Sequence, residues 1–215
     1  RDDRRLDEAQ HVVDRHALIV TRVFEAQDTW LTLEDFAAMW TCLAEFDGLV
    51  FYNAGKTAGA SQRHKHLQIV PLPFIPSEIQ IPISPLIPSA TFQDSIGTIA
   101  QLPFVHALAR LDDISEKSPL QAAEATLKCY RKLLQSINLQ DDERFSRDRQ
   151  SGAYNLLATR EWMLLVARSR ESFESISVNA LGFAGALLVR DRQQMQILKD
   201  CGPMNLLQQV AVPVQ

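Results

Sequence analysis

The sequence has few cysteines, and they do not occur in pairs. Cys42, Cys129 and Cys201 are an odd number spread over 215 residues, with no Cys-x-x-Cys spacing. A disulfide framework needs paired cysteines and a zinc cage needs closely spaced ligands, so this pattern argues against both. We expect reduced thiols in a cytoplasmic protein, and we predict no metal site.

Long apolar runs and a strong positive charge are also missing. No stretch approaches the roughly 18 apolar residues of a membrane span, and no signal-peptide pattern opens the chain. The net charge of −4 argues against broad electrostatic binding to nucleic acid. We therefore expect neither a membrane nor a nucleic acid as a partner.

Positive charge is local instead. Lys56, Arg63 and Lys65 lie in one short segment, which suits a small polyanionic ligand better than a duplex. The charged residues at 1–16 and 141–150 bury little, so we predict a solvated N-terminal stretch and a charged loop.

The stretch from Asn53 to Pro71 combines glycines with two closely spaced histidines. The apolar run at 49–52 predicts a strand, and Gly55 and Gly59 then interrupt regular structure, because glycine accepts backbone angles that other residues resist. Alternation resumes over 64–70 and predicts a second strand. Side chains two residues apart share one face of a strand, so three polar groups would project together: His64, His66 and Gln68.

This arrangement suits chemistry at phosphorus. A neutral imidazole is a competent nucleophile, and the backbone N–H groups of a glycine loop can bind phosphate oxygens. A strand, an anion-binding loop and His-x-His-x-Gln therefore predict nucleotidyl transfer through a phosphohistidine. A zinc pair and surface histidines on a basic strand are the alternatives, because His-x-His alone is a weak signal.

The whole string resembles a family signature. Asn-Ala-Gly-Lys at 53–56, Gly-Ala-Ser-Gln at 59–62 and His-Lys-His-Leu-Gln at 64–68 are similar to the signature of the ATP adenylyltransferases. These enzymes, also called diadenosine tetraphosphate phosphorylases, are a transferase branch of the histidine-triad superfamily. Hydrolases of the superfamily carry a third histidine where this chain has Gln68. A second match, from Tyr154 to Gly185, resembles the family's C-terminal substrate-contacting segment.

The resemblance implies an activity and a set of site residues. The family splits diadenosine tetraphosphate with inorganic phosphate into ATP and ADP. His66 would attack the α-phosphorus and carry the adenylyl group, His64 would line the phosphate site or orient its neighbour, and Gln68 would donate its amide to a phosphate oxygen. The substrate-binding positions that the resemblance implies are Asn53, Gly59, Ala60, Ser61, Gln62, Asn155, Thr159 and Arg170.

The expected partners are therefore a nucleotide and phosphate. No tightly bound cofactor is expected, and Mg²⁺ accompanying the polyphosphate is left open. Three other functions stay open: a hexose-1-phosphate uridylyltransferase, which also uses a His-x-His-x-Gln strand, a dinucleoside polyphosphate hydrolase, and a non-catalytic nucleotide-binding module. The chain starts at Arg1 and not at methionine, so we expect upstream sequence, including basic phosphate-contacting residues of the family, to be absent.

The order of predicted elements indicates the fold class. Further strands are expected at 17–23, 104–111, 153–159 and 162–167, with helices from Thr32 to Gly48, from Ser118 to about Asn138 and on both sides of Gly202. Six prolines between 71 and 88 predict an irregular connection over about 71–90. This order fits an α+β fold, an antiparallel sheet with helices packed on one side, as in the histidine-triad superfamily. We predict one domain over 1–215, whose segment from about 151 completes the nucleotide site.

Overall fold

The computed structural model describes residues 16–73, 79–139 and 149–214. The predicted N-terminal charged stretch, except its last residue, and most of the predicted loop at 141–150 lie outside these ranges. No helix in the described ranges is long and apolar enough to cross a bilayer.

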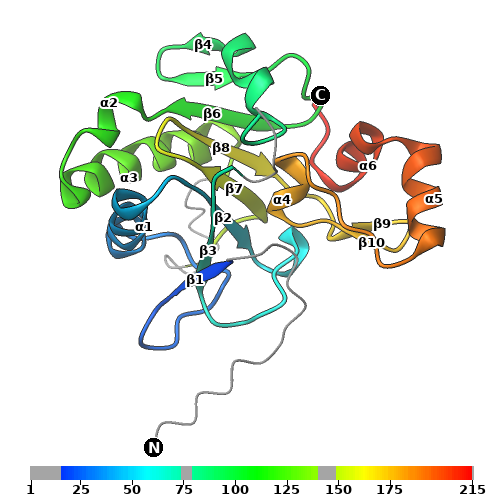
Figure 1. Ribbon diagram of the computed structural model, residues 1–215, viewed down its shortest axis with the longest axis horizontal. Helices are drawn as coiled ribbons and strands as arrows, with labels where there is room; N and C mark the ends of the chain where they lie inside the picture. The colour runs from blue at the N-terminus through cyan, green and yellow to red at the C-terminus, as the bar shows by residue number, and fades with distance from the viewer. Residues whose placement is uncertain (1–15, 74–78, 140–148, 215) are drawn as a thin grey trace, which may run out of the picture.

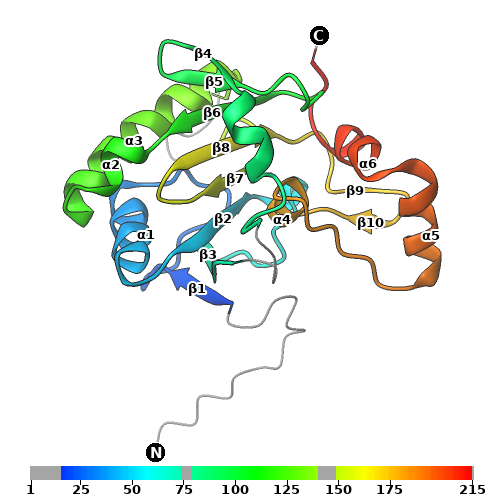
Figure 2. The same cartoon turned by 45° about the horizontal axis from the view of Figure 1, so that its top comes forward.

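The fold is organised around one antiparallel sheet of eight strands, in the order β1-β3-β2-β7-β8-β6-β5-β4 (Figure 2). A separate two-stranded hairpin pairs β9 with β10. The strands are β1 (Ala17–Val20), β2 (Gly48–Ala54), β3 (His66–Pro71), β4 (Thr91–Gln93), β5 (Ile96–Thr98), β6 (His106–Arg110), β7 (Tyr154–Ala158), β8 (Trp162–Ala167), β9 (Ser172–Phe173) and β10 (Ile176–Ser177).

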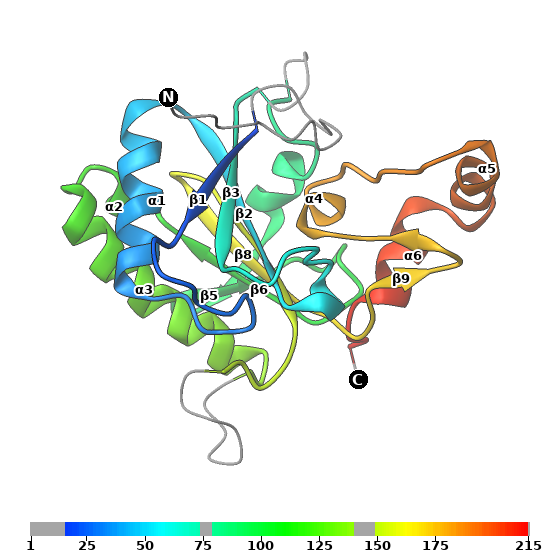
Figure 3. The same ribbon diagram turned by 90° about the horizontal axis from the view of Figure 1, so that it is seen from below.

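The two longest helices, α1 and α3, pack against each other and cover one face of the sheet, while α4 lies on the other side (Figure 3). The C-terminal helices α5 and α6 lie beside the β9–β10 hairpin (Figure 1). The helices are α1 (Leu33–Glu45), α2 (Asp112–Ser115), α3 (Pro119–Ser136), α4 (Ala180–Phe183), α5 (Arg192–Cys201) and α6 (Pro203–Val210), with 3₁₀ turns η1 (Lys56–Ala58) and η2 (Ser84–Ser89). The prediction of an α+β fold is confirmed.

Both faces of the central strands are buried, and alternate residues enter two separate apolar cores. In β2, Val50 and Tyr52 pack toward α1 and α3, whereas Leu49 and Phe51 join a second core that includes residues of α4 and α6. This explains why the central strands appear in the sequence as continuous apolar runs. His66 and Gln68 alternate with Leu67 and Ile69 and therefore lie on the second face of β3.

Local sequence signals set the boundaries of α1 and β2. Thr32 is the N-cap of α1 and forms a capping box, in which the Asp35 carboxylate accepts from the Thr32 N–H at 2.8 Å. The helix ends at Glu45, and Gly48 is the first residue of β2, not the end of the helix. A Cβ at Gly48 would lie 2.9 Å from side-chain carbons of Ile69, so a larger residue there would require the Ile69 side chain to move.

Several predicted strands are shorter in the structure. β1 ends at Val20, β6 begins at His106, and β3 begins at His66, so His64 precedes its strand. Within the described part of the proline-rich connection, η2 is a regular element, since a 3₁₀ turn accommodates prolines that break a longer helix.

The prediction that Lys65 contributes to a positive region for a polyanionic ligand is wrong. Its side chain is 0% exposed, and its Nζ lies 2.6 Å from Asp35 Oδ2 on α1 and 3.1 Å from Glu25 Oε2. The same ammonium donates to the Trp30 carbonyl at 2.8 Å. Lys65 therefore belongs to an internal ion-pair network that ties residues 25–35 to the start of β3, and it is not part of a surface for polyanions.

We expect Lys65→Met to lower the free energy of unfolding by about 3–5 kcal/mol, because it leaves the buried Asp35 carboxylate without its cation. Urea denaturation measures the change. The control is Glu25→Gln, whose side chain is 44% exposed and whose loss should cost less than about 1 kcal/mol. Equal effects of the two substitutions would contradict the assignment of the Lys65–Asp35 pair as the main contact.

Candidate active site

Polar side chains gather at one end of the sheet, on the face turned away from α1 and α3. Asn53 near the end of β2 pairs with Asn155 near the start of β7. His66 is the first residue of β3, and Arg168 directly follows β8. The segment 55–63, which contains both glycines, leaves the sheet at this end.

The two asparagines are joined by hydrogen bonds. Asn155 Nδ2 donates to Asn53 Oδ1 at 2.8 Å and to the Ala58 carbonyl at 2.8 Å. Asn53 Oδ1 also accepts from the Ala180 N–H at 2.8 Å. Both side chains are buried. Their hydrogen bonds connect the sheet, the glycine segment and the N-terminus of α4.

Arg168 extends this network. The side chain is buried, and its Nη1 donates to Asn155 Oδ1 at 2.5 Å and to the Val178 carbonyl at 2.8 Å. The same atom reaches the Ala58 carbonyl at 3.3 Å, while Nε donates to the Val210 carbonyl at 3.1 Å. Burial lowers the pKa of Arg168 to about 10, partly offset by Glu171, so the guanidinium stays charged at neutral pH. One cation thus holds four chain segments together.

The backbone of the glycine segment requires its glycines. Gly55 and Gly59 have φ angles of 81° and 90°, a region that disfavours other residues. A Cβ at Gly59 would lie 2.8 Å from the Val178 carbonyl oxygen, so the loop packs closely on the C-terminal part of the chain.

The amides of this segment divide into two groups. Those of Gly55, Ala58, Gly59 and Ala60 donate within the segment or to Asn53. Those of residues 61–63 make no backbone hydrogen bond to any described residue. The amides of Lys56 and Thr57, at the start of η1, likewise have no described backbone acceptor. The amides at 56–57 and 61–63 are therefore those of the segment that can donate to an anionic ligand.

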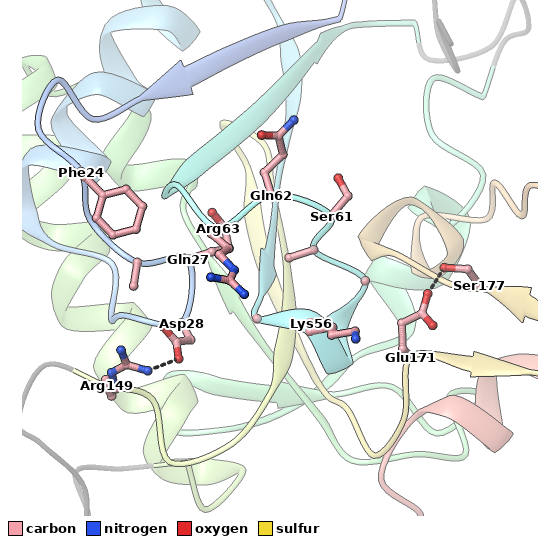
Figure 4. A pocket seen from close by; sticks show the side chains of 14 residues that line it. Phe24, Gln27, Asp28, Lys56, Ser61, Gln62, Arg63, Arg149, Glu171 and Ser177 are labelled. Atoms are coloured by element: carbon pink, nitrogen blue, oxygen red, sulfur yellow. Dashed lines mark hydrogen bonds and ion pairs between the residues drawn. The ribbon is translucent and has the colours of Figure 1, made fainter. Parts of the chain in front are cut away.

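A cavity of about 840 Å³ lies beside the loop, a volume in the range of small-molecule sites (Figure 4). Four predicted substrate-binding residues line it: Gly59, Ala60, Ser61 and Gln62. The remaining lining combines the cations Lys56, Arg63 and Arg149 with apolar, polar and acidic residues: Phe24, Ala26, Gln27, Asp28, Gly55, Glu171 and Ser177. Arg149 Nη1 pairs with Asp28 Oδ2 at 2.7 Å, which leaves Lys56 and Arg63 as the cations on the loop side.

His66 is held in one orientation and is 7% exposed. Its Nδ1 lies 2.8 Å from the His64 carbonyl oxygen. A carbonyl only accepts, so Nδ1 carries the proton of the neutral ring and the lone pair resides on Nε2. This is the tautomer in which Nε2 can act as a nucleophile.

His64 and Gln68 have different surroundings. His64 Nε2 lies 2.9 Å from the Thr21 hydroxyl, and its ring packs against Phe24 with centroids 5.5 Å apart. Gln68 is half-buried in β3, two residues from His66 and therefore on the same face. Of the predicted pair of histidines, only His66 lies within the strand.

Thr159 and Arg170 lie apart from the loop. Thr159 is at the opposite end of β7 from Asn155, where its hydroxyl accepts from Glu161 N–H at 3.1 Å in the hairpin turn. Arg170 is exposed and lines a separate cavity next to α6, together with Ser169, Gln208 and Gln209. The structure thus brings neither residue to the cavity beside residues 59–62.

Comparison with known proteins gives two matches along the chain. Residues 7–89 match the family model of the Ap4A phosphorylase N-terminal domain, and residues 100–213 match that of the ATP adenylyltransferase C-terminal domain. The chain belongs to the ATP adenylyltransferase family. The recognition made on the sequence motifs is confirmed.

Related proteins of this family are known from Saccharomyces cerevisiae. Diadenosine 5',5'''-P1,P4-tetraphosphate phosphorylase 2 is 30% identical over an alignment of 212 residues, which covers 88% of this chain and 62% of that protein. Protein APA1 is 26% identical, over 84% of this chain and 59% of its own length. The chain thus spans about three fifths of these relatives.

Solved structures of yeast Ap4A phosphorylase Apa2 share the fold. The structure in complex with Ap4A has a TM-score of 0.77 at 26% identity and covers 94% of this chain and 71% of its own. Another crystal structure of Apa2 has a TM-score of 0.76 at 28% identity and covers 94% of this chain and 69% of its own.

In this adenylyltransferase homologue the two matched regions form one continuous sheet, because β2 of the first pairs with β7 of the second. Residues 7–89 contribute Asn53, the glycine loop and His66, while residues 100–213 contribute Asn155 and Arg168. Sequence reasoning missed Arg168 and selected Arg170. Arg168 continues the alternation of Leu164 and Val166 on one face of β8, but Arg170 has the same parity. The signal that separates the two arginines is that Arg168 directly follows the buried strand.

We expect Arg168→Met to lower the free energy of unfolding by at least about 3 kcal/mol, because several buried carbonyls lose a charged donor. Substrate affinity should fall as well, because Ala58 and the loop lose their anchor. Chemical denaturation and equilibrium binding of a non-hydrolysable dinucleotide measure the two effects. A variant as stable as the parent protein would refute the anchoring role.

Arg170→Ala is the matched substitution of the neighbouring, exposed arginine. It should change stability by less than about 0.5 kcal/mol. If Arg170 contacts a phosphate, as the family resemblance implies, the variant should bind substrate more weakly by about 1.5–3 kcal/mol. An affinity within about twofold of the parent would assign Arg170 to the surface.

Proposed function

We propose that this chain transfers the adenylyl group of diadenosine tetraphosphate to inorganic phosphate, with ATP and ADP as products. The observation that carries the proposal is the hydrogen bond from His66 Nδ1 to the His64 carbonyl, which leaves the lone pair on Nε2. The yeast relative named as a diadenosine tetraphosphate phosphorylase, and the structures of Apa2 in complex with Ap4A and with AMP, support the choice of substrate.

The reaction has two displacement steps. His66 Nε2 attacks the α-phosphorus, the bond from that phosphorus to the bridging oxygen breaks, and ATP leaves. An oxygen of inorganic phosphate then attacks the adenylylated histidine, breaks the P–N bond and releases ADP. Both steps develop charge on the same phosphoryl oxygens, so one set of donors serves both.

The donors we assign to the polyphosphate are the amides at 61–63 and the side chains of Lys56 and Arg63, all at the cavity. Gln68 supplies an amide on the face of His66. Asn53 and Asn155 support the site chiefly by holding the loop. For direct substrate contacts by His64, Thr159 and Arg170, the support is the family resemblance alone.

The other functions have less support. Neither yeast relative is named as a uridylyltransferase or a hydrolase. A carboxamide at position 68 binds an oxyanion but cannot shuttle a proton as a third histidine would, which favours transfer over hydrolysis.

Within the described residues, no group of three or more His, Cys, Asp or Glu side chains is placed to hold a metal ion. We assign any Mg²⁺ to the polyphosphate substrate. The proposal also includes a cytoplasmic location, which is supported by the three cysteines being free thiols.

Product analysis tests the function directly. The protein is incubated with diadenosine tetraphosphate with and without phosphate, and nucleotides are separated by ion-exchange chromatography. Multiple turnovers to ATP and ADP in equal amounts are expected only with phosphate, whereas without it each chain should release one ATP and stop. Without phosphate, intact mass should show one added AMP per chain. Formation of AMP as the main product would favour a hydrolase.

We expect His66→Ala to lower turnover at least about 10³-fold and to abolish the AMP adduct, because the nucleophile is removed. Peptide mapping of the parent protein should place the adduct on His66. An adduct mapped to His64 would show that the nucleophile is assigned to the wrong histidine.

We expect Gln68→His to increase release of AMP to water relative to transfer onto phosphate, because imidazole can carry a proton. The measured quantity is the ratio of AMP to ADP at a fixed phosphate concentration. Gln68→Asn, which keeps a carboxamide, is the control. The same product ratio in Gln68→His and the parent would remove this role from Gln68.

A further inference from the structure

The hydrogen-bond ladder between β2 and β3 stops just before His66. Its pairs run from Gly48–Pro71 to Phe51–Gln68, and the same register would place Asn53 opposite His66. The two strands separate at this point. The side chain of Gln27, which is 3% exposed and comes from the segment between β1 and α1, occupies the space between them.

Gln27 takes over the hydrogen bonds of the missing strand pair. Its Oε1 accepts from the His66 N–H at 2.8 Å, and its Nε2 donates to the Asn53 carbonyl at 2.9 Å and to the His66 carbonyl at 3.3 Å. The side-chain amide therefore acts as a peptide group inserted between the strands. It holds both backbone polar groups of His66.

Gln27 is itself held firmly. Its N–H donates to the Arg63 carbonyl at 2.9 Å, and its carbonyl accepts from the Tyr52 hydroxyl. Two residues earlier, the Glu25 carbonyl accepts from the Lys65 N–H at 2.8 Å. A buried side chain fixed at both its backbone and its amide has little freedom to relax.

The same segment also holds the acceptor of the imidazole. Ala26 forms a β-bridge with His64, whose carbonyl binds His66 Nδ1. Residues 26 and 27 together therefore fix both the backbone of His66 and the group that sets its tautomer. The location of Nε2 follows from these contacts.

We propose that Gln27 is a positioning residue for His66. The proposal rests on the proposed function, in which Nε2 attacks phosphorus. Reacting atoms must meet within a narrow range, and a misplacement of about 1 Å can cost about 100-fold in rate. Loss of the Gln27 amide should therefore lower kcat far more than it raises KM.

Gln27→Met and Gln27→Glu test this. Methionine fills the space without hydrogen bonds, and kcat should fall about 100-fold. A glutamate carboxylate accepts from the His66 N–H but cannot donate to the two carbonyls. Burial beside those carbonyls should raise its pKa, so the protonated, donating form returns as pH falls. The ratio of Gln27→Glu to parent kcat should therefore increase at least about tenfold from pH 8.5 to pH 6.

Thr126→Val is the control for stability. It removes a buried hydrogen bond from Trp40 Nε1, 2.8 Å long, on the far side of the sheet. Its kcat should stay within about twofold of the parent. The proposal would be overturned if kcat of Gln27→Met stayed within about threefold of the parent. It would also be overturned if the ratio of Gln27→Glu kcat to parent kcat did not change with pH.

The His66 tautomer provides a readout that does not depend on activity. ¹⁵N NMR of labelled histidine should show Nδ1–H in the parent protein and in Thr126→Val, but a mixture of tautomers in Gln27→Met. If the parent forms no AMP adduct, the proposed function fails while this spectrum still decides the positioning role. An unchanged His66 tautomer in Gln27→Met would then exclude it.

Discussion

The contacts of Arg168 are the constraint on which the candidate site depends. A glycine loop can offer amides to an anion only if its own backbone is fixed. Nη1 of Arg168 fixes it by binding the Ala58 carbonyl and the Asn155 carboxamide together. The guanidinium is desolvated, yet its donors meet several carbonyls, which offsets the cost of burying the charge.

A second buried cation stabilises the other side of the site. Lys65 ties residues 25–35 to β3 from the face opposite His66, so the segment that carries Gln27 is held through the Glu25 and Trp30 carbonyls and through ion pairs. Buried ion pairs contribute little net stability compared with apolar packing, but they disfavour alternative arrangements in which a charge would be unpaired. In this protein both buried cations lie where chain segments distant in sequence must meet.

Much of the fold was predictable because its signals are local. The helix that opens after Thr32, the two strands on either side of Arg160–Glu161 and the helices on both sides of Gly202 appear where the pattern places them. The roles of Lys65, Arg168 and Gln27 were not predictable in the same way. Each depends on partners that lie far away in the sequence, such as Asn53 for Gln27 and Ala58 for Arg168.

The sequence by itself determined the family, the α+β class and the region of the candidate nucleophile, because the histidine motif and the glycines are contiguous and their backbone demands are local. Only the tertiary structure decided which charges face a ligand and which are buried. In the structure Lys65 is buried, and Arg168 is the buried arginine that binds the glycine loop, whereas Arg170 is exposed. The physical reason is that alternation along a strand assigns a side chain to a face, whereas sheet register and the segments packed above decide what that face meets.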